Sequence, residues 1–187
     1  VDGTGGALSG RTYLTGWPDR DPVIPGSVPY GDVIVPFVKV AGITAALARR
    51  ESTGQGAHID AAMYEICVQQ MHDAIVRAQH GEKPARQGND DPAWYRQGLW
   101  PARGEDRWIA ISARDEAQWQ RIHDLAGGEE LSDWTSKHTD YELMGLLQKA
   151  GIVAGVVQDI EDVIDRDAVL AARGALMDLP HPVLGTF

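Results

Sequence analysis

The longest apolar stretch of the chain lies between residues 33 and 50. Ile34, Phe37 and Ala41 recur on one face at helical spacing, and other apolar residues fill most of the remaining faces. A helix that is apolar all round is typically buried in a protein core. The pattern therefore predicts a long buried helix, which Gly54 brings to an end.

The start of this helix allows two interpretations, because Asp32 and Pro36 stand close together. If Asp32 is the N-cap, Pro36 falls at the fourth helical position and removes a hydrogen bond. If Pro36 occupies the first helical position, Asp32 lies in the loop ahead of the helix. The first interpretation makes Asp32 a structural cap, and the second leaves its carboxylate available for chemistry.

The rest of the chain alternates short helical and extended patterns around loops. The first thirty residues are rich in Gly, Pro and Asp and predict a loop with one short helix. Asp115 followed by Gln118 predicts a helix that opens with a capping box. The pattern also predicts a β-hairpin. Its second strand is apolar on both faces, which is typical of a strand in the interior of a sheet. The predicted elements are strands at 57–61, 95–100, 107–113 and 152–157, and helices at 62–79, 115–126, 139–150, 160–164 and 167–173.

The bulk composition is that of an ordinary globular protein. The chain has 187 residues, of which 43% are hydrophobic, and its net charge is −10. Such an acidic balance argues against nucleic acid and anionic membrane surfaces as partners. No run of eighteen apolar residues lacks both charge and proline, so no membrane span is expected. A Gly-rich opening without an initiator Met predicts that the chain begins inside a longer protein.

Cysteine and histidine usage narrows the candidate chemistry. Cys67 is the single cysteine, so no internal disulfide can form, which indicates a reducing, cytoplasmic compartment. Its place on the apolar stripe of a predicted helix indicates a buried structural thiol. The six histidines form no metal-binding pattern, so no metal site is predicted, and no nucleophilic serine motif is present. Asp32 remains as the acid to be explained.

The chain as a whole resembles the class III CoA-transferase family, also called the CaiB/BaiF family, which includes formyl-CoA transferase. The segments "LTGWPDRDPVIPG", "GD" at 31–32 and "GITAALARRESTGQGAHIDAAMYE" follow the order and spacing of the family's central motifs. Later, "AGIVAGVVQDIEDVI" and "RGALMDLPHPVLGTF" are similar to its closing segments. Each match is weak by itself, and the ordered set is specific.

The resemblance implies a reaction and its site residues. In this family the Asp of the Gly-Asp pair is the nucleophile, which corresponds to Asp32. It would attack an acyl-CoA thioester to form an aspartyl acyl anhydride and then an aspartyl-CoA thioester, moving coenzyme A between carboxylic acids. Gly31 would let the substrate approach closely, and Met63 would line the CoA thiol end. The alternative for Met63 is an ordinary core methionine. The implied substrates are acyl-CoA and carboxylic acids, with no metal.

The resemblance also implies an architecture. The fold class is α/β, a fragment of the class III CoA-transferase fold with a long buried helix, short strands and a small α+β domain. Residues 1–85 correspond to part of the large domain that carries the nucleophile. Residues 86–187 correspond to the small α+β domain and the start of a return segment. The half that supplies most CoA contacts is expected outside this chain, and an interlocked homodimer is implied.

The sequence departs from the family at several positions, and two other functions remain open. Val33 and Ile34 replace small residues after Asp32, and Val153 and Val156 replace prolines. One alternative is an α-methylacyl-CoA racemase of the same family, in which the Asp acts as a general acid or base with a histidine. The other is a non-catalytic half of a tandem CoA-transferase with a structural role.

Overall fold

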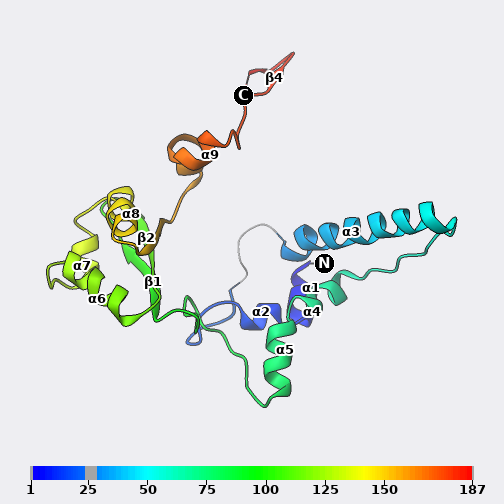
Figure 1. The fold of residues 1–187 in the computed structure, drawn as a ribbon, viewed down its shortest axis with the longest axis horizontal. Helices are drawn as coiled ribbons and strands as arrows, with labels where there is room; N and C mark the ends of the chain where they lie inside the picture. Colours follow the sequence, from blue (N-terminus) through cyan, green and yellow to red (C-terminus); the bar gives the residue numbers. More distant parts are fainter. Residues whose placement is uncertain (1, 24–28, 187) are drawn as a thin grey trace. The chain divides into compact units, whose positions relative to one another are not determined.

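The fold was analysed in a computed structural model, which describes residues 2–23 and 29–186. The chain divides into two compact units, Val1–Asn89 and Asp90–Phe187. The first contains the long helix drawn in blue to cyan, and the second contains the β-hairpin drawn in green (Figure 1). Each unit is described by itself.

Helices make up the regular structure that is described in the first unit. Helix α1 packs against α2, α3 and α4, and α3 also packs against α4. This cluster buries Val35, Ile66 and Cys67. The helices are α1 (Asp2–Leu8), α2 (Arg11–Leu14), α3 (Tyr30–Thr53), α4 (Met63–Gln69) and α5 (His72–Gln79).

Helix α3 begins earlier than either interpretation of the sequence allowed. Its N-cap is Pro29, and Pro36 lies inside the helix. Proline at this position removes the N–H that would bond to the carbonyl of Asp32, while the turns on either side stay helical. The predicted stop is confirmed, because Gly54 has φ 72° and its N–H donates to the Arg50 carbonyl at 2.7 Å.

The prediction that this helix is buried on all sides is wrong in the structure. Within α3 only Gly31 and Val35 are buried among the described residues, and Phe37 is 73% exposed. The two buried positions lie in the first turns, so the contacts with α1 and α4 protect little of the helix beyond them. By length and composition α3 could also cross a bilayer, a test that core helices of soluble proteins pass as well.

Two further predictions for the first unit are wrong. Residues 57–61 are extended but form no strand, because no neighbouring segment among the described residues supplies ladder hydrogen bonds. The single helix predicted over 62–79 is two helices, α4 and α5. They separate at Gln70 and Met71, where the Met71 N–H bonds to the Val68 carbonyl in a tighter turn.

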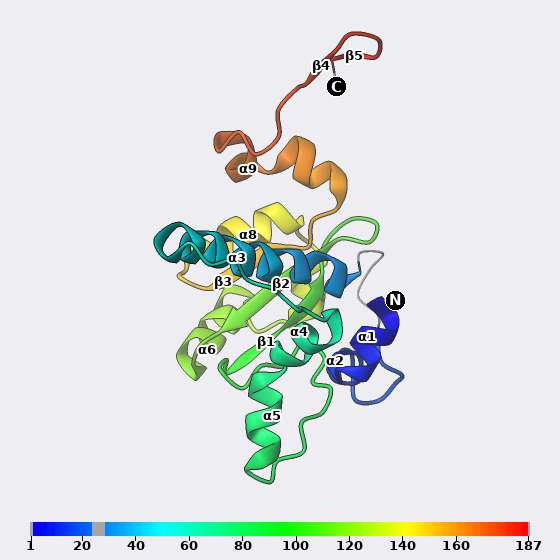
Figure 2. The same cartoon turned by 90° about the vertical axis from the view of Figure 1, so that its right-hand side faces the viewer.

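The second unit is built on a three-stranded antiparallel sheet, which confirms the predicted hairpin. Its strands are β1 (Arg96–Pro101), β2 (Trp108–Ala113) and β3 (Val153–Val156), with β2 in the middle. Every second residue of β2 points to the same face of the sheet. On the face that packs against the helices, these residues are almost fully buried: Ile109, Ile111 and Ala113. They pack with α6 (Glu116–Leu125), α7 (Leu131–Thr135) and α8 (Asp140–Lys149), which are drawn in green to yellow (Figure 2).

Side-chain caps define the helices of this unit. The Asp115 carboxylate accepts the Gln118 N–H at 2.7 Å, as the sequence predicts, but the Gln118 side chain accepts from Arg114 instead of the N-cap. Thr139 and Glu142 form a complete capping box on α8. Leu125, the last residue of α6, is 39% exposed. The chain continues through a π-helical turn at Asp162–Arg166, α9 (Ala168–Ala172), β4 (Pro180–His181) and β5 (Gly185–Thr186).

Replacing Gly98 with alanine should destabilise the sheet by about 1–3 kcal/mol. A Cβ at this position would lie 2.9 Å from the indole of Trp100, which packs against Trp119 at a centroid distance of 6.0 Å. The matched control is Gly155→Ala in β3, because a Cβ there meets nothing within 4 Å. Urea-induced unfolding of both variants measures the difference. Equal midpoints would show that Trp100 does not constrain position 98.

Candidate functional site

Asp32 lies in the first turn of α3 with an exposed side chain. Its carboxylate makes no hydrogen bond or ion pair with any of the residues that the structure describes. The N-cap is Pro29, without a side-chain hydrogen bond, so the interpretation of Asp32 as a structural cap is wrong. The positive end of a helix favours a negative charge in its first turn. None of the described residues therefore occupies the carboxylate oxygens of Asp32.

Gly31 and Met63, the other residues nominated from the sequence, belong to the same helix cluster. Gly31 is buried directly before Asp32. Met63 is the first residue of α4, and its Sδ lies 4.0 Å from the position that a Cβ at Gly5 would occupy. Because α1, α3 and α4 pack on one another, the structure brings the elements that carry all three nominated residues together.

Arg11 and Tyr30 join this cluster without having been identified from the sequence. The Arg11 Cζ lies 4.7 Å from the centroid of the Tyr30 ring, and Tyr30 is the first residue of α3. The contact joins segments on either side of a Pro-rich loop. No periodic pattern could have revealed it, since it depends on how the two helices meet.

Backbone carbonyls in and directly before the segment "LTGWPD" accept hydrogen bonds from residues 86 and 88. Arg86 donates from Nε to the Trp17 carbonyl at 3.0 Å and from Nη1 to the Tyr13 carbonyl at 2.9 Å. The Gly88 N–H donates to the Gly16 carbonyl at 2.8 Å. Gly88 has φ 61°, and a Cβ there would lie 2.6 Å from Trp17. These contacts hold the segment in its conformation, so its Gly and Trp residues have a structural role.

A pocket of about 390 Å³ lies further along α3. Its lining includes Lys39 and Ile43 from the helix, with Ala57, Ile59 and Ala61 from the extended segment. Lys39 follows Asp32 by seven residues, so the two share a helix face about 10 Å apart along the axis. The face that carries Asp32 therefore continues into a mainly apolar pocket with one cation.

The second unit holds a cluster of charged groups around Arg107. This guanidinium lies 2.7 Å from Asp162 and 2.5 Å from Asp140, and the Asp162 side chain is fully buried. The hydrogen bond from Arg107 holds the pKa of Asp162 well below its ordinary value. Asp162 also accepts from Tyr141 and Arg166. Because its oxygens are already bonded, this buried acid has a structural role.

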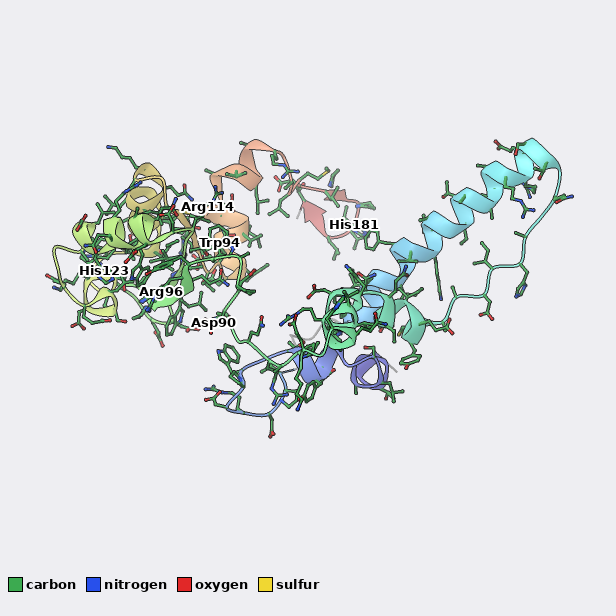
Figure 3. The ribbon with its side chains drawn as sticks, turned by 60° about the horizontal axis from the view of Figure 1, so that its bottom comes forward. Asp90, Trp94, Arg96, Arg114, His123 and His181 are labelled. Carbon is green, nitrogen blue, oxygen red and sulfur yellow. The ribbon has the colours of Figure 1, made fainter. Side chains whose placement is uncertain are left out.

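Arginine side chains stack on tryptophan rings in the second unit, where Figure 3 labels Arg96, Arg114, Trp94 and His123. The Arg96 Cζ lies 5.4 Å from the Trp119 ring centroid, and the Arg114 Cζ lies 5.7 Å from that of Trp94. His123 meets Trp119 edge-on at 5.1 Å. Such contacts stabilise packing between strand and helix. Over residues 2–23 and 29–186, no group of three or more His, Cys, Asp or Glu side chains could hold a metal ion.

The sequence model of CoA-transferase family III matches residues 1–133 and 126–187. The chain belongs to this family. A probable CoA-transferase of Mycobacterium tuberculosis is 26% identical over 88% of this chain. A succinyl-CoA:mesaconate CoA-transferase of Haloarcula hispanica is 30% identical over 94% of it. The chain spans 23% and 49%, respectively, of the lengths of these relatives.

Solved structures agree with the family assignment. A CaiB/BaiF family protein from Brucella suis superposes with a TM-score of 0.82 and 25% identity, over 96% of this chain and 52% of that protein. A second protein, from M. tuberculosis, shares the fold with a TM-score of 0.71 at 21% identity, over 100% of this chain and 54% of its own. The predicted α/β fold class, as part of the CoA-transferase fold, is thereby confirmed.

Proposed function

We propose that the protein transfers coenzyme A between carboxylic acids, with Asp32 as the nucleophile. The observation that carries this proposal is the exposed carboxylate of Asp32 in the first turn of α3, which makes no hydrogen bond or ion pair with the described residues. Membership of a CoA-transferase family supports the reaction class. The first helical turn favours negative charge, which suits both the carboxylate and an oxyanion formed beside it.

The reaction begins with attack by an Asp32 oxygen on the thioester carbonyl of the donor acyl-CoA. The C–S bond breaks, the CoA thiolate leaves, and an aspartyl acyl anhydride forms. The thiolate then attacks the Asp32 carbonyl, releasing the donor acid and leaving an aspartyl-CoA thioester. The acceptor carboxylate repeats these two steps in reverse, which yields the new acyl-CoA and regenerates Asp32. Covalent catalysis divides one difficult exchange into easier steps.

The substrates that this proposal favours are dicarboxylic acids. The names of several relatives specify succinyl-CoA with mesaconate, succinyl-CoA with L-malate, and acetyl-CoA with oxalate. The acids in these names carry two carboxyl groups, except acetate. We extend this substrate class to the present chain, with one carboxylate reacting and the other available for binding.

The remaining assignments follow from the same proposal. Gly31 admits the substrate beside Asp32, and Met63 contacts the thiol end of CoA from α4. Residues 1–85 supply the nucleophile, and residues 86–187 form the small α+β domain with the start of the return segment. A second copy of the chain is the proposed partner in an interlocked homodimer, and the cytoplasm is the proposed compartment.

Transfer of a labelled oxygen tests the chemistry directly. The intact protein is incubated with succinyl-CoA and with mesaconate in which both carboxylates carry ¹⁸O. The mass of the peptide that contains Asp32 is then measured by mass spectrometry. The anhydride route leaves one acceptor oxygen on Asp32 in each turnover, so this peptide should become heavier. Racemisation by proton transfer, or a purely structural role, leaves Asp32 unlabelled. An unlabelled peptide after measurable CoA transfer would exclude Asp32 as the nucleophile.

A further inference from the structure

An open pocket of about 690 Å³ lies along α8, the helix drawn in yellow in the second unit (Figure 2). From the helix it is lined by exposed residues spaced three or four apart, which therefore share one helix face: Glu142, Gly145, Leu146 and Lys149. Arg103, from the turn after β1, lines it as well. We call this pocket the α8 groove.

The positive charges of the α8 groove stand at both of its ends. Arg103 Nη2 lies 3.4 Å from Glu142 Oε2, which places the guanidinium beside the first turns of α8. Lys137 lines the same end, since its carbonyl accepts from Arg103 Nη1 at 3.1 Å. Lys149 follows Glu142 by seven residues, so it stands about 10 Å further along the helix axis. The chain carries a net charge of −10, and three cations nevertheless converge on this one groove.

These cations can accept a further anion at small cost. Lys149 forms no hydrogen bond or ion pair with any residue that the structure describes. Arg103 pairs with Glu142 and Lys137 pairs with Glu129, and the two cationic side chains are 58% and 59% exposed. Exposed ion pairs contribute little stability, because water screens them, and an incoming carboxylate can therefore replace them.

The middle of the α8 groove is open and apolar. Gly145 lies in the interior of α8, where glycine destabilises a helix relative to alanine. Its φ is not positive, and a Cβ there would meet nothing within 4 Å, so neither conformation nor packing requires glycine. The adjacent Leu146 is 45% exposed. The missing side chain leaves room for the backbone of a ligand to lie directly against the helix.

We propose that the α8 groove binds an extended acidic peptide segment of a partner protein. Alternate residues of an extended chain point to the same side, and four residues span about 13 Å. Acidic side chains at positions i and i+4 therefore pair with the cations at the two ends, whose flexible side chains take up the difference in length. An apolar residue at i+2 lies on Leu146 between them. A groove open along a helix face suits a peptide, whereas small ligands favour enclosed cavities. This inference is independent of CoA transfer at Asp32.

Fluorescence anisotropy of a dye-labelled peptide, GEVLVEG, tests the proposal on the full chain. The valines favour an extended conformation and place leucine midway between the two acids. The peptide should bind, and its affinity should fall as salt is added. The peptide GEEVLVG has the same composition but neighbouring acids, so it should bind at least about five-fold more weakly. Equal affinities, or no binding of either peptide, would overturn the proposal.

A charge variant tests the end of the groove that Lys149 forms. Lys149→Gln should weaken binding of GEVLVEG by about three- to five-fold, because one ion pair is lost. Arg173→Gln is the matched control, since Arg173 is an exposed cation of the same unit that does not line the groove. It should leave the affinity unchanged. Equal losses in the two variants would show attraction to overall charge and reject a site on α8.

A variant that blocks the groove tests its middle without weakening the fold. Gly145→Glu introduces a carboxylate one turn before Lys149, where it repels the peptide and pairs with that lysine. Glutamate also favours a helix more than glycine does, so the thermal midpoint should equal or exceed that of the parent. Binding of GEVLVEG should be lost. Undiminished binding in this variant would contradict the proposed position of the peptide.

Competition with inorganic pyrophosphate distinguishes a peptide from a phosphate ligand. Unlabelled GEVLVEG should displace the labelled peptide at a lower concentration than pyrophosphate does, because only the peptide reaches both ends of the groove and the apolar residue between them. The reverse order would assign the α8 groove to a phosphate ligand and reject the acidic peptide as its occupant.

Discussion

Replacing Asp32 with asparagine should abolish CoA transfer by the intact protein. The amide cannot form an anhydride with the acyl group, so we expect kcat to fall by at least about 10⁴-fold. The shape of the side chain is kept, and Asp32 makes no hydrogen bond or ion pair with the described residues. Stability should therefore change by less than about 1 kcal/mol. Exchange of labelled CoA between two acids measures the activity.

Asp60→Asn provides the matched control for this experiment. Asp60 is an exposed carboxylate of the same unit, in the extended segment outside the helix cluster. Its loss should leave transfer within about two-fold of the parent, as expected for a surface substitution. Retention of more than about one hundredth of the parent rate in Asp32→Asn would contradict the nucleophile assignment.

Replacing Arg107 with alanine should destabilise the second unit by about 3 kcal/mol. The Arg107 side chain is only 17% exposed and lies between two buried carboxylates, Asp140 and Asp162. Removing the cation leaves those charges desolvated without their main partner. The loss also disconnects the start of β2 from α8 and from the π-helical turn. Urea-induced unfolding followed by circular dichroism measures the effect, and hydrogen exchange locates it.

Arg103→Ala is the control for Arg107→Ala. Arg103 precedes the same hairpin strand and pairs with Glu142 at 3.4 Å, but its side chain is 58% exposed. Exposed pairs contribute about 0.2–1 kcal/mol, because water and salt screen them. Similar losses in the two variants would show that burial of the network has no energetic consequence.

Local patterns predicted the second unit well. The hairpin around β1 and β2 depends on alternation along each strand and on a turn between them, which are both read from neighbouring positions. The cap at Asp115 is likewise a contact within three residues. The first unit was harder, because Pro29 gives no side-chain signal for a helix start and Pro36 suggested a boundary that the helix passes through.

The candidate site depended on information that periodicity does not contain. Asp32 was nominated through the family resemblance, since an acid before an apolar run predicts a cap more readily than a nucleophile. The helical pattern predicted neither the break at Met71 nor the contact of Arg11 with Tyr30. The contact of Arg11 with Tyr30 depends on how segments that are distant in the sequence meet.

The buried position of Cys67 provides an intrinsic reporter of unfolding for the first unit, and the tryptophans provide a separate one for the second. A thiol shielded inside the helix cluster reacts with an alkylating agent only when that cluster opens, so its modification rate measures local unfolding of the first unit. Indole fluorescence reports mostly on the second unit, which contains Trp94, Trp100, Trp108, Trp119 and Trp134, against Trp17 in the first. The cooperativity between the units can thus be measured without an introduced label.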